Sequence, residues 1–449
     1  MEIVIKLSQF LLSLSLLIIL HELGHFIPAK IFKTRVEKFY LFFDAKFSLV
    51  KKKIGETEYG IGWLPLGGYV KIAGMIDESM DKEQMNLPPQ PWEFRSKPTW
   101  QRLIIMLGGV TVNFILAFVI YIGMSYAYGD QFIYTKDVKD GIWVANPVVE
   151  KTGLKTGDKI ISINGTPAAE KFENINEELQ VAKHIVVERD GQQKTIDLPQ
   201  DFIGQLLEGE RASIVELRVP FVVTGVQDDS PNKDKVKPKD IITVFNGQTV
   251  QYADQVLASV DTLKGKTVQA VVLRDGKKIP LNLIVSDSSK MGIQFGGRLA
   301  YDNLEKLGIY KINRQKYGFG ESFPVGMEKG KERLVKYSQQ LKAIFTPSTG
   351  AYAGVGGFYA IFNVFPDQWS WEVFWSITAL LSIMLGVMNL LPIPALDGGH
   401  VMFLLYEMIT RRKPSDKFME YAQITGFVLL IALVLFANGN DIYRAITRK

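Results

Sequence analysis

Four stretches of the chain are apolar over a length that can cross a bilayer as a helix, which takes about 20 residues. Between the second and the third lies a long segment in which polar and apolar residues alternate in short runs. The pattern therefore predicts a polytopic α-helical membrane protein with four transmembrane helices and a β-rich insertion. The four stretches are Ile3 to about Phe32, the residues after Trp100, about Trp371 to Leu391, and about Tyr421 to Ala437.

The composition agrees with a polar domain joined to membrane spans. Of the 449 residues, 47% are hydrophobic and 22% are charged, which disfavours both a wholly soluble enzyme and a compact all-membrane bundle. The net charge of +5 is too small for this length to indicate a nucleic-acid partner. The chain has no cysteine, so thiolate metal sites, disulfides and cysteine nucleophiles are excluded.

Basic residues in the short loops predict the orientation of the spans. They cluster after the first span and between the third and the fourth, and positive charge marks the cytoplasmic side. Both termini and the long insertion are then expected outside the cytoplasm. The basic residues are Lys30, Lys33, Arg35, Lys38, Lys51–Lys53, Arg411, Arg412, Lys413 and Lys417.

The insertion contains two similar segments, GDKIISINGTPA from Gly157 and KDIITVFNGQTV from Lys239. Asp158 aligns with Asp240, and each is followed by a β-branched run and an Asn-Gly pair, which is typical of a strand that ends in a tight turn. Each copy then continues into a strand–turn–strand pattern (VVERDGQQKTIDL and VVLRDGKKIPLNL). Two copies of this size predict two similar β-rich domains and not a solenoid.

The first apolar stretch ends in His21-Glu22-Leu23-Gly24-His25, an HExxH motif. On a helix the residues i and i+4 share one face, so both imidazoles can reach one zinc ion while Glu22 flanks the water to be activated. Ionisable residues in an apolar span are costly and usually functional. The motif therefore predicts an intramembrane zinc site.

Zinc held by two histidines needs a third ligand. We expect it to be Asp397, which follows Asn389-Leu-Leu-Pro-Ile-Pro-Ala-Leu at the end of the third span. The first and third spans enter from the same side, so the two motifs reach a similar depth. His400 is the alternative ligand and is otherwise expected to be solvated, and His184 is expected at the surface of the insertion.

The HExxH motif and the Asn-x-x-Pro-x-Pro-x-Leu-Asp-Gly-Gly motif together resemble the site-2 protease family of intramembrane zinc metalloproteases. The four-span layout with its insertion resembles the regulator-of-sigma-E protease branch of that family. The segments KTGLKTGDKIISING and its second copy look like tandem PDZ domains, with a departure at DDSPNKDKVKPKD that leaves open whether the second groove binds peptide. The alternative is that one or both copies only block access.

The resemblance implies roles for further residues. Asn389 would position the substrate or its oxyanion, and the segment Tyr59–Lys71, with Gly67, Gly68 and Tyr69, would form a membrane-associated β-hairpin that pairs with the substrate as a strand. Gly108-Gly-Val-Thr-Val-Asn113 stands where relatives often have Gly-Pro-x-x-Asn. This departure is expected to involve no proposed ligand. The basic, amphipathic stretch from Met327 to Phe345 is expected on the outer membrane surface.

The function predicted from the resemblance is that of an intramembrane zinc endopeptidase of the bacterial inner membrane. Its expected partners are the lipid bilayer and single-span membrane proteins, such as anti-sigma factor-like proteins and signal-peptide remnants, cut after a first extracytoplasmic cleavage; no nucleic acid is expected. A PDZ-bearing scaffold and a metal transporter are the alternatives. The expected domains are helix 1 (1–32), cytoplasmic loop (33–100), helix 2 (101–127), PDZ 1 (128–220), PDZ 2 (221–305), an amphipathic region (306–370), helix 3 (371–400), cytoplasmic loop (401–420), and helix 4 with its tail (421–449).

Overall fold

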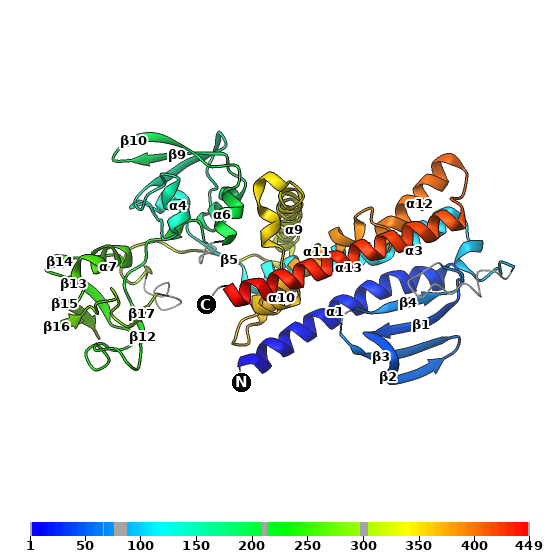
Figure 1. Ribbon diagram of the computed structural model, residues 1–449, viewed down its shortest axis with the longest axis horizontal. Coiled ribbons are helices and arrows are strands. Elements are labelled where there is room, and N and C mark those ends of the chain that lie inside the picture. Colours follow the sequence, from blue (N-terminus) through cyan, green and yellow to red (C-terminus); the bar gives the residue numbers. More distant parts are fainter. Residues whose placement is uncertain (1, 66, 76–87, 209–212, 297–303, 448–449) are drawn as a thin grey trace. The chain divides into compact units, whose positions relative to one another are not determined.

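A computed structural model describes the chain except residues 1, 66, 76–87, 209–212, 297–303 and 448–449 (Figure 1). The chain divides into two compact units. The helical unit comprises Met1–Gly129, Lys316–Lys342 and Val355–Lys449, and the insertion unit comprises Asp130–Gln315 and Ala343–Gly354.

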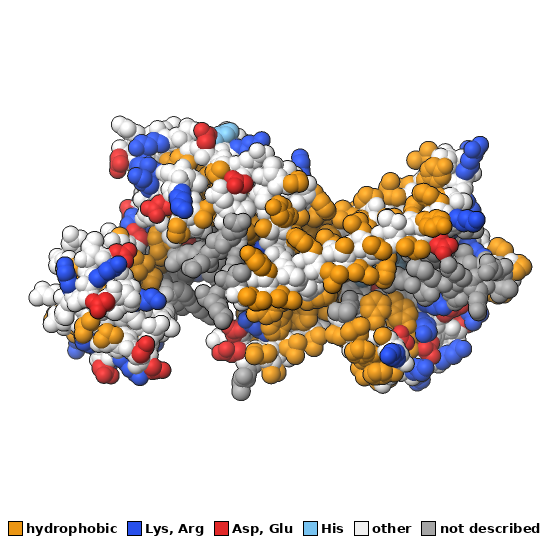
Figure 2. Space-filling model, viewed as in Figure 1, with side chains coloured by type: hydrophobic (Ala, Val, Ile, Leu, Met, Phe, Trp, Pro, Cys, Tyr) orange, Lys and Arg blue, Asp and Glu red, His pale blue; other side chains and the backbone are white. Residues whose placement is uncertain are grey.

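Among the described residues of the helical unit, four helices are long and apolar enough to cross a membrane, which confirms the prediction of four such segments. Several of their apolar side chains are exposed, and hydrophobic side chains cover much of the visible surface of these helices (Figure 2). Such a surface fits lipid better than water. The helices are α1 (Glu2–Ile31), α3 (Thr99–Tyr128), α11 (Trp371–Leu390) and α13 (Asp416–Thr447).

Helix α3 lies at the centre of the helical unit and packs against α1, α11 and α12 (Asp397–Thr410). Its buried residues include Ile105, Met106 and Ala117. Helices α1 and α11 run in the same direction, as the sequence predicts: Ser13 Oγ lies 2.9 Å from Thr378 Oγ1, and further along both helices His21 Nε2 lies 3.4 Å from Asn389 Nδ2.

After α1 the chain forms a four-stranded sheet with the order β2-β3-β1-β4. Strands β2 and β3 form an antiparallel hairpin, whereas β3 and β4 both pair with β1 and not with each other. The expectation of a hairpin within Tyr59–Lys71 is therefore wrong, because β1 lies between the two halves of that segment. The strands are β1 (Val36–Leu41), β2 (Phe43–Ile54), β3 (Thr57–Leu64) and β4 (Tyr69–Ile72).

The glycines of this segment lie where neighbouring strands approach closely. A Cβ atom on Gly60 would lie 2.3 Å from the Tyr40 ring, and one on Gly62 would lie 2.2 Å from the Phe43 carbonyl oxygen. These glycines mark close contacts with neighbouring strands, and not turns.

The insertion unit contains two four-stranded antiparallel sheets with the same strand order, β10-β9-β7-β8 and β16-β15-β13-β14. A short helix, α5 or α7, follows the second strand of each in sequence. The first set is β7 (Lys159–Ile163), β8 (Thr166–Pro167), α5 (Ile175–Gln180), β9 (His184–Arg189) and β10 (Gln192–Asp197). The second is β13 (Ile241–Phe245), β14 (Gln248–Thr249), α7 (Ala253–Val260), β15 (Thr267–Arg274) and β16 (Lys277–Ile284).

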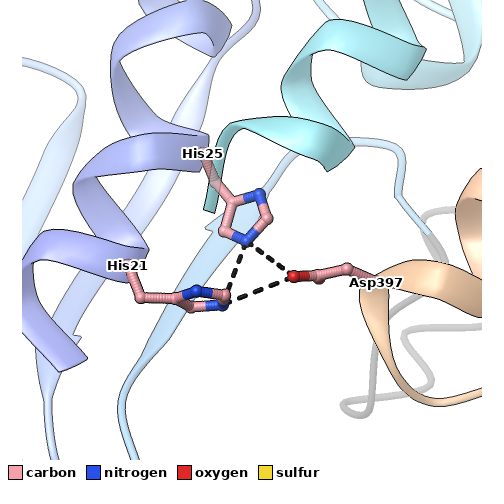
Figure 3. A group of neighbouring side chains, drawn as sticks. All are labelled: His21, His25 and Asp397. Atoms are coloured by element: carbon pink, nitrogen blue, oxygen red, sulfur yellow. Dashed lines mark hydrogen bonds and ion pairs between the residues drawn. The ribbon is translucent and has the colours of Figure 1, made fainter. Parts of the chain in front are cut away.

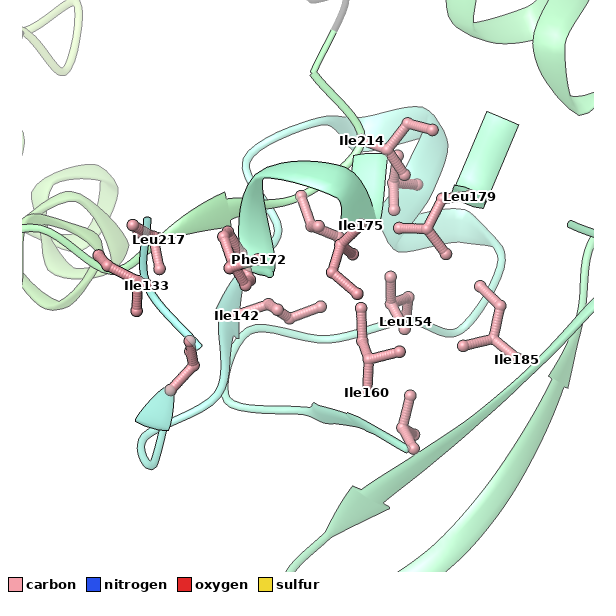
Figure 4. Packing of buried hydrophobic residues seen from close by; sticks show 14 of the residues in the cluster. Ile133, Ile142, Leu154, Ile160, Phe172, Ile175, Leu179, Ile185, Ile214 and Leu217 are labelled. Atoms are coloured by element: carbon pink, nitrogen blue, oxygen red, sulfur yellow. The ribbon is translucent and has the colours of Figure 1, made fainter. Parts of the chain in front are cut away.

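Each sheet has its own hydrophobic core. Leu154, Ile160 and Ile175 are buried in the first core, where they pack between sheet and helix (Figure 4). Phe245, Val256 and Val272 are buried in the second. The insertion is thus stabilised by two apolar clusters that follow the two similar segments of the sequence.

The same ion pair occurs in both halves of the insertion. Asp158 is fully buried and accepts two hydrogen bonds from Arg189, at 2.6 and 2.7 Å. Asp240 accepts two from Arg274, at 2.7 and 2.6 Å. These hydrogen bonds to Asp158 and Asp240 raise the pKa of both guanidinium groups. The aspartates that align in the sequence therefore occupy equivalent positions.

The longer segment of the insertion unit, Asp130–Gln315, begins and ends on one pair of strands, since β5 (Asp130–Phe132) pairs antiparallel with β18 (Asn313–Gln315). Helix α9 (Phe319–Ile344) includes the predicted amphipathic stretch; Gly326 and Gly330 lie close to Ile122 and Phe118 of α3. The remaining elements are β6 (Ile142–Trp143), α4 (Pro147–Lys151), α6 (Phe202–Glu208), β11 (Glu216–Leu217), β12 (Val223–Val226), β17 (Ile293–Phe295) and α10 (Phe358–Val364).

Candidate active site

Helix α1 places His21 and His25 on one buried face. The two residues are 8% and 7% exposed, and their Nε2 atoms lie 3.3 Å apart. Between them Gly24 meets the backbone of α3: a Cβ atom on Gly24 would lie 2.4 Å from the Gly108 carbonyl oxygen. The glycine of the HExxH motif thus lets α1 and α3 approach at the level of the two imidazoles.

Asp397 reaches the same point as the first residue of α12. Its Oδ2 atom lies 3.4 Å from His21 Nε2 and 3.3 Å from His25 Nε2 (Figure 3). Just before it, Ala395 has a φ of +88°, in the left-handed region that non-glycine residues rarely adopt. Backbone strain of this kind clusters at functional sites. The residue after Asp397 must be small, because a Cβ atom on Gly398 would lie 2.3 Å from the Leu391 carbonyl oxygen.

These three side chains fit a zinc ion. Among the described residues they form the one group of three metal-binding side chains whose ligand atoms all lie within 4.8 Å of one another. Asp397 Oδ2 is buried and makes no hydrogen bond within the described part of the chain. A buried carboxylate oxygen without a donor is costly, and two imidazole nitrogens with one carboxylate are a known catalytic zinc set.

Helix α3 also contacts both imidazoles. His25 Nδ1 lies 2.8 Å from the Ile105 carbonyl oxygen, and His21 Nδ1 lies 3.0 Å from the Asn113 amide. A Cβ atom on Gly109 would lie 2.4 Å from His25 Nε2. The residues of the Gly108–Asn113 segment that meet the imidazoles are Gly109 and Asn113. Sequence reasoning gave neither of them a role, although a glycine pair followed by an asparagine inside an apolar span was the signal available.

Glu22 directly follows His21 on α1 and lies beside the segment that leads into β4. A Cβ atom on Gly68 would lie 3.5 Å from Glu22 Cγ and 2.5 Å from Ile18. The close approach of the Gly68 backbone to α1 brings the start of β4 next to the predicted general base. Within the described residues, β4 is an outer strand of its sheet.

The other predicted substrate-binding residues lie around this point. Asn389, at the end of α11, has its amide nitrogen 3.4 Å from His21 Nε2. Gly67 precedes Gly68, and a Cβ on it would lie 3.0 Å from the Phe43 ring. Tyr69 donates a hydrogen bond to Asp44, at 2.9 Å; burial and the Asp44 carboxylate raise the pKa of its phenol, which keeps it a donor.

The remaining histidines lie outside the group of three. His400 is in the first turn of α12 and is 9% exposed, so the expectation of a solvated side chain is wrong. It is buried because α12 continues to Thr410 and packs against α3, within the range 401–420 that was expected as a loop. His184 is half-buried in β9 of the insertion unit.

Spanning helices that bring two histidines and an aspartate together define the class of membrane metallopeptidases. The sequence profile described as Peptidase family M50 matches residues 9–433, which is nearly the whole chain. The chain therefore belongs to peptidase family M50, the site-2 protease family, and the prediction of a zinc metalloprotease is confirmed at the level of the family.

Bacterial relatives align over almost their full length. One from Campylobacter jejuni is 28% identical, with 97% of this chain and 92% of the relative aligned. One from Treponema pallidum is 27% identical over 98% of this chain and 99% of the relative. One from Vibrio cholerae is 27% identical over 97% and 98%. All three carry the name "putative zinc metalloprotease".

Proposed function

We propose that this chain is an intramembrane zinc endopeptidase that cuts the transmembrane segments of single-span membrane proteins. The observation that carries the proposal is the buried, hydrogen-bond-free Asp397 Oδ2 facing the Nε2 atoms of His21 and His25. These three residues would hold the metal. A bound Zn²⁺ would polarise the scissile carbonyl and lower the pKa of a water molecule toward about 7.

Glu22 is proposed as the general base. It follows the first proposed ligand on α1, so its carboxylate can take a proton from the attacking water and later give it to the departing amine. It is not one of the three side chains grouped for metal binding. The amide of Asn389, 3.4 Å from His21 Nε2, can donate a hydrogen bond to the substrate carbonyl as negative charge develops there.

The substrate must unwind before it is cut, because a transmembrane helix holds its carbonyls in internal hydrogen bonds. Strand β4 is proposed to bind the unwound segment as an added strand. Two observations support this: β4 is an outer strand in the described chain, and Gly68 at its start lies beside Glu22. Tyr69 would then hold the sheet in place through Asp44.

The insertion is proposed to consist of two PDZ domains that lie outside the cytoplasm and exclude substrates with an intact ectodomain. The shared strand order and the shared Asp–Arg pair support two copies of one domain. The substrates would be anti-sigma factor-like proteins and signal-peptide remnants of the bacterial inner membrane. The positive-inside distribution of Lys and Arg supports this orientation, with both termini outside the cytoplasm. The expected domain boundaries, the regulator-of-sigma-E protease branch and a surface position of Met327–Phe345 belong to the same proposal.

The test is cleavage by the purified chain in lipid vesicles, with single-span proteins whose ectodomains are intact or truncated. We expect cleavage inside the span of the truncated forms, and loss of cleavage when a chelator removes the metal. Glu22→Gln should keep one zinc per chain and lower the rate by a factor of at least about 10²–10⁴.

Glu372→Gln, in the first turn of α11, is the matched control and should cleave normally. Cleavage only outside the span would contradict the proposal. So would stoichiometric loss of zinc from folded Glu22→Gln protein, since Glu22 would then be a ligand.

A further inference from the structure

Asn113 is a polar residue in the middle of an apolar helix, and its side chain meets a proposed metal ligand. It is fully buried in α3, with its amide nitrogen 3.0 Å from His21 Nδ1. Its amide oxygen is buried and has no hydrogen-bond partner among the described residues. A buried polar group without a partner is unfavourable. Helix packing alone does not account for an asparagine here.

The two imidazoles differ in what they meet at Nδ1. A neutral imidazole carries its proton on one nitrogen and a lone pair on the other. His25 Nδ1 faces the Ile105 carbonyl, which can only accept, so Nδ1 carries the proton and Nε2 keeps its lone pair. This is the form that binds a metal through Nε2.

His21 needs the same form, because its Nε2 also faces Asp397 Oδ2. An acceptor must then lie at His21 Nδ1, and the contact that the structure gives there is the Asn113 amide. An amide presents either its oxygen or its nitrogen after a half turn about the Cβ–Cγ bond. No hydrogen bond fixes the Asn113 oxygen. The half turn therefore breaks no other hydrogen bond of that oxygen and brings it, in place of the amide nitrogen, to His21 Nδ1.

We propose that Asn113 is a positioning residue for the zinc site: its amide oxygen accepts the Nδ1 proton of His21 and so keeps the Nε2 lone pair available to the metal. The inference rests on the proposed function, in which His21 binds zinc through Nε2. Helix α3 then sets the protonation of both histidines, through the Ile105 carbonyl and the Asn113 amide. Gly109 lies midway between them and leaves room for the rings.

The test compares two substitutions that differ in one property. Asn113→Asp keeps an acceptor oxygen at the same place, whereas Asn113→Leu has a similar shape and no acceptor. Loss of an outer partner of a metal-binding histidine typically weakens metal binding 10- to 100-fold. We therefore expect the zinc dissociation constant, measured by competition with a chelator, to rise about 10- to 100-fold in Asn113→Leu and to stay near the wild-type value in Asn113→Asp.

A second measurement reports the proton directly. In zinc-loaded protein labelled with ¹⁵N-histidine, His21 should carry its proton on Nδ1 in the wild type and in Asn113→Asp. The spectrum is tractable because the chain has 4 histidines. Thr378→Val is the matched control, because it removes the buried hydrogen bond between the Ser13 and Thr378 hydroxyls, which joins α1 and α11, without touching a ligand; it should bind zinc normally.

The inference is overturned if folded Asn113→Leu binds zinc as tightly as the wild type. It is also overturned if Asn113→Asp loses as much affinity as Asn113→Leu, because the amide would then act as a donor. If Asn113→Leu does not fold, Asn113→Asp and its NMR spectrum still decide between acceptor and donor. The proposed function fails separately, if the wild type binds no zinc or if His21→Ala keeps it.

Discussion

Asp397 places a carboxylate oxygen at a buried position of the candidate site. A carboxylate oxygen inside an apolar unit without a hydrogen bond is unfavourable unless a cation or a donor reaches it. Its neighbours at 3.4 and 3.3 Å are the Nε2 atoms of two histidines. The position of one oxygen atom therefore says more about the chemistry of the site than the length of any helix.

Replacing Asp397 by asparagine should remove zinc. The amide has nearly the same shape but no charge, so we expect the zinc content of the purified variant to fall from one per chain to well below that, with cleavage lost. Metal content can be measured by mass spectrometry. His400→Gln is the comparison: it should keep zinc, because His400 lies outside the group of three. Zinc lost from His400→Gln and kept by Asp397→Asn would show that the third ligand is misassigned.

The sequence predicts part of the site and not the rest. His21 and His25 follow from helical spacing alone, since i and i+4 share a face whatever the tertiary fold. Asp397 required the additional argument that two parallel spans bring their motifs to the same depth. Ile105, Gly109 and Asn113 could not be found in this way, because their roles depend on how α3 is rotated about its own axis.

Helix α3 contributes no proposed ligand but contacts both histidines of the site. It approaches α1 backbone to backbone at Gly24 and Gly108, and it faces both imidazoles at Gly109. A span that supplies none of the three proposed ligands thus determines how two of them are oriented.

Gly109→Ala should therefore weaken zinc binding. Its Cβ would lie 2.4 Å from His25 Nε2 and 2.6 Å from His21 Cε1, so the rings must move. We expect the zinc dissociation constant to rise at least about tenfold, the lower end of what a disturbed ligand orientation costs. Gly123→Ala, on the same helix, is the control: a Cβ there meets nothing within 4 Å, and zinc binding should not change. Equal affinities in the two variants would contradict the packing argument.

The sheet of the helical unit illustrates what local patterns leave out. The close backbone approach was recognisable from the glycines of Tyr59–Lys71. The pairing was not recognisable, because β1 and β3 are neighbours in the sheet and pair in parallel although β2 lies between them in the sequence, and parallel pairing carries no turn signal.

For the whole molecule, the order of the spans and the insertion between them could be read from hydropathy, and the structure has helices at all four places. The paired strands β5 and β18 at the start and end of the insertion unit could not, since each has only three residues.

Removing the insertion between these strands should change which substrates are cut. The variant joins Phe132 to Asn313 through a tight turn and keeps His21, Glu22 and Asp397. A folded ectodomain of about 100 residues has a radius of gyration of about 13 Å. We propose that the insertion excludes substrates because of this bulk, which truncated substrates lack. We expect zinc to be retained, cleavage of intact substrates to rise, and cleavage of truncated substrates to stay the same.

Truncated substrates are the internal control in this experiment. If the variant binds zinc but cleaves neither form, the insertion recruits substrates or supports the helices, and exclusion is not its role.

The separation of the site along the chain also has a consequence for biosynthesis. His21 and His25 are translated long before Asp397, which follows only after the insertion and the third span. At about 5–20 residues per second, the interval is on the order of tens of seconds. A nascent chain therefore holds two imidazoles and the general base without their carboxylate partner. The proposed enzyme would share the membrane with freshly inserted helices of other proteins. Its zinc site stays incomplete until its own third span has been translated.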